Sequence, residues 1–171
     1  MKKVLVTGSA GFIGFHLVKA LLKMGFEIIG IDNLNNYYDP KLKYDRLENL
    51  NSFILDRQID NSYQFIKLDI LDEFALKKLF EKHDFDIVIN LAAQAGVRYS
   101  LEKPKVYIES NLVGYANILE CCRHFKIEHF IFASSSSVYG MNSKQPFSTS
   151  DNTDFPISLY AATKKSNELL A

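Results

Sequence analysis

Short runs of apolar residues alternate along this chain with longer stretches in which apolar residues recur at helical spacing. The short runs occupy residues 2–7, 26–31, 63–68, 86–91 and 129–133. The longer stretches occupy residues 12–24, 41–50, 72–82 and 104–126, and a last one that opens at Pro156. Strands that alternate with helices pair in parallel through right-handed crossovers, and near-continuous apolar strands need cover on both faces. We therefore expect an α/β fold: a doubly wound parallel sheet in three α/β/α layers. For its five strands we predict the order 3-2-1-4-5, which is common among doubly wound sheets.

Length and charge restrict the class of protein. A chain of 171 residues fits one domain, residues 1–171. Lys and Arg number 20 and Asp and Glu number 20, so the balance lacks the basic excess that a nucleic-acid partner favours. No apolar run approaches the ~20 residues that span a bilayer. The scattered histidines show no metal-ligand spacing, and the adjacent Cys121 and Cys122 do not suggest a disulfide framework. We expect a cytoplasmic protein with no metal and no membrane partner.

Three glycines, Gly8, Gly11 and Gly14, lie between the first predicted strand and the first predicted helix. Glycines at this junction permit a tight turn and let the backbone approach a pyrophosphate. The amide groups of Phe12, Ile13 and the rest of the first helical turn would face that anion. The alternative is an ordinary glycine-rich turn. The position of the three glycines at the first strand-to-helix junction favours a dinucleotide site of the Rossmann type.

Asp32 ends the second predicted strand, 18 residues after Gly14. A carboxylate there can accept hydrogen bonds from both adenosine ribose hydroxyls and would repel a 2′-phosphate, which favours NAD over NADP. The alternative is a strand-ending Asp that starts a turn. Asp69, after the third strand, is a weaker candidate for the adenine amino group, because acids near a helix start also act as caps.

Tyr160 and Lys164 are four residues apart after Pro156, so they share one helix face. A phenol ordinarily loses its proton near pH 10, and a neighbouring ammonium lowers that pKa, so such a pair can act as a base. A half-buried tyrosine beside a solvated lysine is the alternative. The four serines at 134–137 follow the fifth strand, at the carboxyl edge where open α/β sheets bind ligands, although serines there also cap turns.

Together these motifs resemble the extended short-chain dehydrogenase/reductase superfamily. The resemblance rests on the glycine loop, Asp32, Asn90-Leu91-Ala92-Ala93, the serines before Val138-Tyr139-Gly140, and Tyr160-Ala161-Ala162-Thr163-Lys164. Residues 32–40 and 92–100 are similar to the UDP-glucuronate 4-epimerases of bacterial capsule and surface-polysaccharide synthesis.

The resemblance implies NAD as cofactor and a UDP-sugar as substrate. Tyr160 would take the proton of the sugar 4-hydroxyl, with Ser135 and Lys164 as the other catalytic residues. Further cofactor contacts would come from Asn33, Asn35, Asp69, Ile70, Leu91, Ala92, Ala93 and Gln94. Substrate contacts would come from Arg98, Ser135, Ser136 and Ser137. Because the related dehydratases carry Asp-Glu where this chain has Ser136 and Ser137, the resemblance favours epimerisation over water elimination.

The chain ends at Ala171 within a helical pattern, and members of the family continue for nearly as much chain again. We therefore expect a truncated chain that lacks the C-terminal sugar-nucleotide domain and shows no turnover by itself. The longer protein would dimerise through residues 104–126 and the segment from Pro156, with that contact weakened or altered here. Three alternatives stay open: another UDP-hexose 4-epimerase or a UDP-glucuronate decarboxylase, a binding module that holds NAD without turnover, and a fragment that self-associates.

Overall fold

The computed structural model describes residues 1–59 and 62–171, and its centre is a parallel sheet. The strands are β1 (Lys3–Thr7), β2 (Glu27–Asp32), β3 (Tyr63–Lys67), β4 (Ile87–Asn90) and β5 (His129–Phe132). They lie side by side in the order β3-β2-β1-β4-β5, and every pair is parallel. The predicted class and strand order are therefore confirmed.

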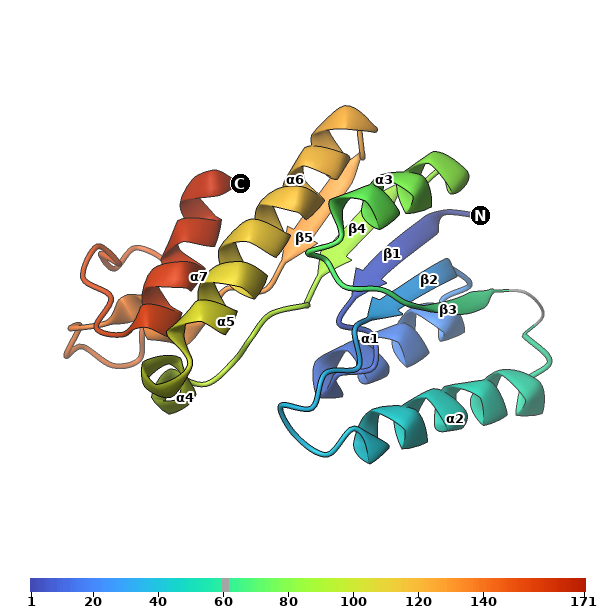
Figure 1. Ribbon diagram of the computed structural model, residues 1–171, viewed down its shortest axis with the longest axis horizontal. Helices are drawn as coiled ribbons and strands as arrows, with labels where there is room; N and C mark the ends of the chain where they lie inside the picture. Colours follow the sequence, from blue (N-terminus) through green and yellow to red (C-terminus); the bar gives the residue numbers. More distant parts are fainter. Residues whose placement is uncertain (60–61) are drawn as a thin grey trace.

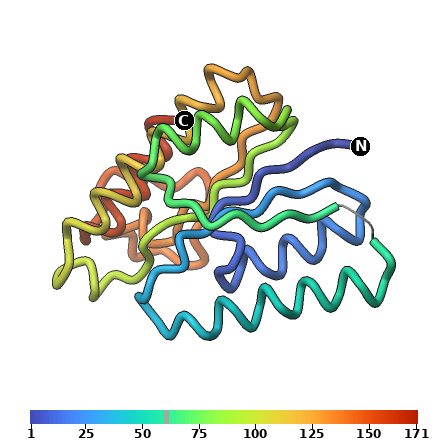
Figure 2. The backbone as a smooth tube through the Cα atoms, turned by 45° about the vertical axis from the view of Figure 1, so that its right-hand side comes forward, coloured from blue at the N-terminus to red at the C-terminus, as the bar shows by residue number. Residues whose placement is uncertain are grey.

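Helices cover both faces of the sheet, as Figures 1 and 2 show. On one face lie α1 (Phe12–Lys23) and α2 (Lys41–Asp56), whose residues Val18, Leu22 and Leu50 pack against β1 and β2. On the other lie α3 (Glu73–Lys82) and α6 (Tyr115–His124). Helix α2 continues six residues beyond the predicted end at Leu50. None of the helices described is both long and apolar enough to cross a membrane.

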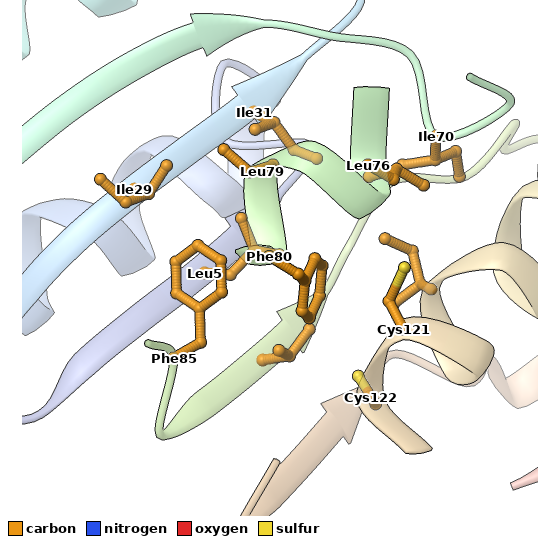
Figure 3. Packing of buried hydrophobic residues seen from close by; sticks show 12 residues of the cluster. Leu5, Ile29, Ile31, Ile70, Leu76, Leu79, Phe80, Phe85, Cys121 and Cys122 are labelled. Carbon is orange, nitrogen blue, oxygen red and sulfur yellow. The ribbon is translucent and has the colours of Figure 1, made fainter. Parts of the chain in front are cut away.

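Side chains of β1 alternate between the two cores. Val4 and Val6 join the core under α1 and α2, whereas Leu5 joins the core under α3 and α6. In the second core Leu5 lies beside Phe80 and Phe85 (Figure 3). The Val4, Leu5 and Val6 side chains are fully buried. Burial of each aliphatic side chain of this size contributes about 1.5–3 kcal/mol to the stability of the fold. Strand β1 thus lies at the centre of the fold, and the loop that follows it begins from a strand that is buried on both faces.

The predicted single helix over residues 104–126 is wrong in detail. The structure has α5 (Pro104–Ile108), a π-helical turn (Glu109–Gly114) and α6, which ends at His124. The sequence pattern also missed α4 (Val97–Glu102) before it. Such π-helical turns are rare and often occur at functional sites. This one contains Asn111, whose buried side chain is hydrogen-bonded to the backbone of Gln94.

The last helix, α7 (Leu159–Leu170), begins three residues later than the predicted start at Pro156. Its N-cap is Ser158, whose hydroxyl accepts a hydrogen bond from the Ala161 amide. Between β5 and α7 the serine run enters a short 3-10 helix, Ser136–Tyr139. Helix α7 packs against α4, α5 and the π-helical turn, next to the end of β5 (Figure 1).

Candidate functional site

The loop between β1 and α1 is held by contacts that leave no space for a side chain. Gly8 has φ of +67°, which favours glycine. A Cβ on Gly14 would lie 2.2 Å from the carbonyl oxygen of Gly8, and one on Gly8 would lie 2.9 Å from the amide nitrogen of Ala92. The loop therefore lies against both helix α1 and the chain after β4, which leaves a backbone cradle at the sheet edge.

Helix α1 starts directly from this cradle. Gly11 is its N-cap and supplies no side-chain cap, so the amide groups of Phe12, Ile13 and Gly14 lack an acceptor within the helix. The Phe12 and Ile13 side chains themselves are exposed. An uncapped helix N-terminus with free amides and a positive dipole end is a binding site for an anionic phosphate.

A groove that is open to solvent runs along the carboxyl ends of β1, β2, β3 and β4. Most residues predicted to hold the cofactor line it: Gly8, Gly11, Asp32, Asn33, Asn35, Asp69, Ile70, Leu91, Ala92, Ala93 and Gln94. The structure thus brings together residues from four separate loops. Phe12, Ile13, Gly14, Tyr160 and Lys164, which we also predicted to contact the cofactor, are not part of this lining.

Asp32 lies in the groove as half of a buried ion pair, which the sequence analysis did not anticipate. Its Oδ1 accepts from the Lys43 Nζ at 2.9 Å and from the Leu34 amide at 2.8 Å. Asp69 accepts a hydrogen bond from the Asn33 side chain, and the cap of α3 is Asp72. Asp72 and not Asp69 is thus the N-cap of α3, but Asp69 Oδ1 also accepts from the Leu71 amide in the turn before that helix. Asp69 lines the same groove as Asp32.

Gln94 connects the groove to the second half of the fold. Its backbone N–H donates to Asn111 Oδ1, and Asn111 Nδ2 donates to the Gln94 carbonyl and to Thr163 Oγ1 on α7. The carbonyl of Asn111 accepts from Asn167, also on α7. The Gln94 side-chain Nε2 is buried in the groove without a hydrogen-bond partner among the described residues.

These features fit a bound dinucleotide. The glycine cradle, which a Cβ would fill, and the uncapped helix accept a pyrophosphate, and the carboxylates of Asp32 and Asp69 suit the adenosine end. Gln94 lines the same groove, and its Nε2 is one of four buried side-chain atoms without a hydrogen-bond partner among the described residues.

Tyr160 and Lys164 lie on α7, beyond the end of β5. The Lys164 side chain is buried and its Nζ donates to the Ala133 carbonyl at 3.0 Å. Burial lowers the pKa of this ammonium to about 8. The Tyr160 and Tyr107 rings pack edge to face. The Tyr107 hydroxyl lies 2.6 Å from the carbonyl oxygens of both Ala95 and Gly96 beside the groove, and either can accept its one hydrogen. Through Tyr107 the predicted base is thus packed onto the loop that borders the groove.

The serines after β5 differ from one another. Ser135 N-caps the 3-10 helix, and its Oγ accepts from the amide and the hydroxyl of Ser137. Ser136 is exposed, and the Ser134 hydroxyl donates to Glu168 on α7. Arg98 lies exposed on α4. Of the residues predicted to contact substrate, Ser135 and Ser137 are hydrogen-bonded to each other.

Sequence reasoning missed Lys43 and Asn111. Lys43 occupies the first turn of α2, where the helix dipole disfavours a cation, and that mismatch was the available signal. Its burial against Asp32 explains the placement. Asn111 interrupts an apolar helical pattern, and only its tertiary partners show why.

The chain is similar to known proteins over almost its whole length. Residues 5–171 match the family described as GDP-mannose 4,6 dehydratase. Protein CapI from Staphylococcus aureus is 55% identical over 169 residues, which cover 99% of this chain and 48% of that protein. UDP-glucuronate 4-epimerase 3 from Arabidopsis thaliana is 49% identical over 172 residues, which cover 98% of this chain and 37% of that protein.

A solved structure agrees with these sequence relatives. The UDP-glucuronic acid 4-epimerase from Bacillus cereus, determined with UDP-glucuronic acid and NAD, superposes with a TM-score of 0.84 at 39% identity. The superposition covers 98% of this chain and 50% of that one. The chain spans about half the length, or less, of the curated relatives it matches. By its sequence and by its fold, the chain belongs to the GDP-mannose 4,6 dehydratase family.

Proposed function

We propose that this chain is the NAD-binding part of a nucleotide-sugar 4-epimerase that interconverts UDP-glucuronate and UDP-galacturonate. The observation that carries the proposal is the groove itself, which joins a glycine cradle and the Asp32 carboxylate to a loop that Tyr107 connects to Tyr160. The similarity to UDP-glucuronate 4-epimerases supports the choice of sugar.

The cradle and the first-turn amides of α1 would bind the pyrophosphate of NAD. Asp32 and Asp69 would bind its adenosine end, and the free Nε2 of Gln94 would donate to an acceptor on the cofactor. The chemistry that bound NAD would supply is the reversible removal and return of a hydride at C4 of the sugar.

Tyr160 would accept the proton of the sugar 4-hydroxyl at its Oη and return it when the reaction completes. Lys164 would turn its ammonium from the Ala133 carbonyl toward a ribose hydroxyl of the cofactor. With a pKa of about 8, that ammonium is mostly charged at neutral pH, as this role needs. The Ser135 hydroxyl would bind the sugar 4-oxygen, and Arg98, Ser136 and Ser137 would contact the substrate.

The proposal includes a homodimer of the longer protein. Residues on α5, the π-helical turn and α7 expose large apolar side chains, among them Val106, Ile108, Val113, Leu169 and Leu170. Paired across a two-fold axis, these elements would bury that surface. Light scattering tests this, and a tight dimer of the 171 residues alone would contradict the expected weakening. A cytoplasmic location and a part in polysaccharide synthesis remain predictions.

The decisive experiment measures conversion of UDP-glucuronate to UDP-galacturonate by chromatography, with UDP-glucose as the comparison substrate. We expect turnover by a protein of the relatives' length and none by the 171 residues alone, because positioning of the sugar contributes about 7–11 kcal/mol to lowering such a barrier. In the longer protein, Tyr160→Phe should lower turnover by at least ~10²-fold. Normal turnover by that variant would exclude the mechanism, and preference for UDP-glucose would exclude the proposed substrate.

A further inference from the structure

The adenosine end of the groove contains a lysine as well as the expected carboxylate. Lys43, on the first turn of α2, holds its Nζ 2.9 Å from Asp32 Oδ1, and the two side chains are only 7% and 5% exposed. Both residues line the groove. The charge that a ligand meets here therefore belongs to the pair and not to Asp32 alone.

Each partner keeps hydrogen-bonding capacity for a ligand. Asp32 Oδ1 is occupied by Lys43 and the Leu34 amide, whereas the structure gives Oδ2 no partner within residues 1–59 and 62–171. The Lys43 ammonium donates to Asp32 and to Asn35 Oδ1, which leaves one of its three N–H groups. One free acceptor beside one free donor matches a ribose diol, in which one hydroxyl donates and the other accepts.

The ion pair also changes how the groove discriminates against a 2′-phosphate. A lone Asp32 would repel that group, but Lys43 offsets much of the repulsion. If the carboxylate charge were removed, Lys43 would remain as a buried cation without its counter-ion, which is a costly arrangement that a bound anion relieves. Arg46, the other cation nearby, donates to the Ala10 carbonyl and the Tyr38 hydroxyl and does not line the groove.

We propose that Lys43 is a specificity-determining residue for the cofactor. It donates to a hydroxyl of the adenosine ribose while Asp32 neutralises it, and it becomes a phosphate-binding residue when Asp32 is neutral. This inference rests on the proposed function, because it assumes that the groove binds a dinucleotide. It predicts that Asp32→Asn turns a preference for NADH into a preference for NADPH, and that this change requires Lys43.

The test is direct titration of NADH and NADPH, followed by the fluorescence of the reduced nicotinamide, so that no catalysis is needed. The variants are Asp32→Asn, Lys43→Met and the double variant. We expect Asp32→Asn to bind NADPH at least tenfold more tightly than the unmodified chain does. The double variant should bind NADPH less than threefold more tightly than the unmodified chain does. Lys43→Met alone should weaken NADH binding severalfold. A double variant that binds NADPH as tightly as Asp32→Asn would overturn the inference.

A matched control removes the neighbouring cation. Asp32→Asn combined with Arg46→Gln should keep the tenfold gain in NADPH affinity. Loss of that gain would show that Arg46 binds the 2′-phosphate and would refute the role of Lys43. Lys43→Met leaves Asp32 unpaired and could therefore fail to fold. The double variant carries neither charge, so its NADPH affinity still tests the inference, and circular dichroism verifies its fold. Failure of the unmodified chain to bind NADH contradicts the proposed function. Normal NADH binding without coupling between Asp32 and Lys43 contradicts only this inference.

Discussion

The two halves of the candidate site, the groove after β1 and β2 and the region between β4 and α7, are built by different means. At the β1–β2 half the decisive groups are main-chain atoms, and Gly8 and Gly14 approach other backbone so closely that a methyl group has no space. At the β4–β5 half the decisive groups are side chains, with Asn111 and Asn167 bonding one loop and two helices together. The first half should therefore be sensitive to added atoms and the second to the loss of polar atoms.

The largest effect should come from Gly14→Ala. The new Cβ would lie 2.2 Å from the Gly8 carbonyl oxygen, and since that atom is backbone the whole cradle must shift. We expect NADH binding to weaken by at least ~100-fold, a loss of about 2.7 kcal/mol or more, in a fluorescence titration.

Gly25→Ala is the matched control for that prediction. Gly25 also has positive φ, +82°, but a Cβ there would meet nothing within 4 Å. Its cost should be backbone strain alone, about 1–2 kcal/mol of stability, with NADH binding unchanged. Equal weakening of NADH binding by both variants would show that the cradle is not built as described.

Asn111→Ala should be the most damaging change in the second half. It leaves the backbone amide and carbonyl of Gln94 without their partner in a buried setting, whereas the Thr163 hydroxyl keeps its hydrogen bond to the Tyr160 carbonyl. We expect urea denaturation to show a loss of about 2–3 kcal/mol. Asn117→Ala, which removes one partly buried bond to Ile70, should cost about 1 kcal/mol, and a similar cost at both positions would contradict the proposed importance of the Asn111 contacts.

Lys164 should make stability depend on pH. Burial lowers its pKa in the folded chain to about 8 from 10.5, so between these values the unfolded chain binds more protons and stability rises with pH. Below about pH 8 the Lys164 ammonium is charged in the folded chain, and the full cost of burying it lowers the free energy of unfolding. From pH 7 to 9.5 this group should add about 2 kcal/mol to the free energy of unfolding.

Lys164→Met should remove that contribution, whereas Tyr160→Phe keeps the buried ammonium and should retain it. Denaturant unfolding at several pH values measures the difference between each variant and the unmodified chain. A pH dependence that persists unchanged in Lys164→Met would show that other groups cause it.

The smallest effects should come from hydroxyls that act locally. Ser158→Ala removes the N-cap of α7 and should cost about 1 kcal/mol of stability. Ser134→Ala removes an exposed bond to Glu168 and should cost less than about 0.5 kcal/mol. Thermal melts that rank these two variants in the opposite order would show that the serine loop contributes more to the second half than its exposure suggests.

Prediction from the sequence worked best where local pattern and tertiary requirement coincide. Strand β1 has an apolar centre and its following glycines mark a tight turn, so the parallel pairing of the strands and the cradle followed from periodicity and spacing. The prediction failed for residues 104–126, because the amphipathic pattern is continuous while the backbone contains a π-helical turn. It also placed the start of α7 at Pro156, although Ser158 provides the cap.

The sequence by itself determined the order of strands and helices, the cradle after β1 and a carboxylate at the end of β2, because each depends on residues close together in the chain. Only the tertiary structure decided that Asp32 is paired with Lys43, that Gln94 keeps a free donor, and that Asn111 joins β4's loop to α7. Lys43 lies 11 residues from Asp32, and Thr163 lies 52 residues from Asn111. A buried polar group must find a partner wherever the packed chain offers one, and such partners leave no periodic trace in the sequence.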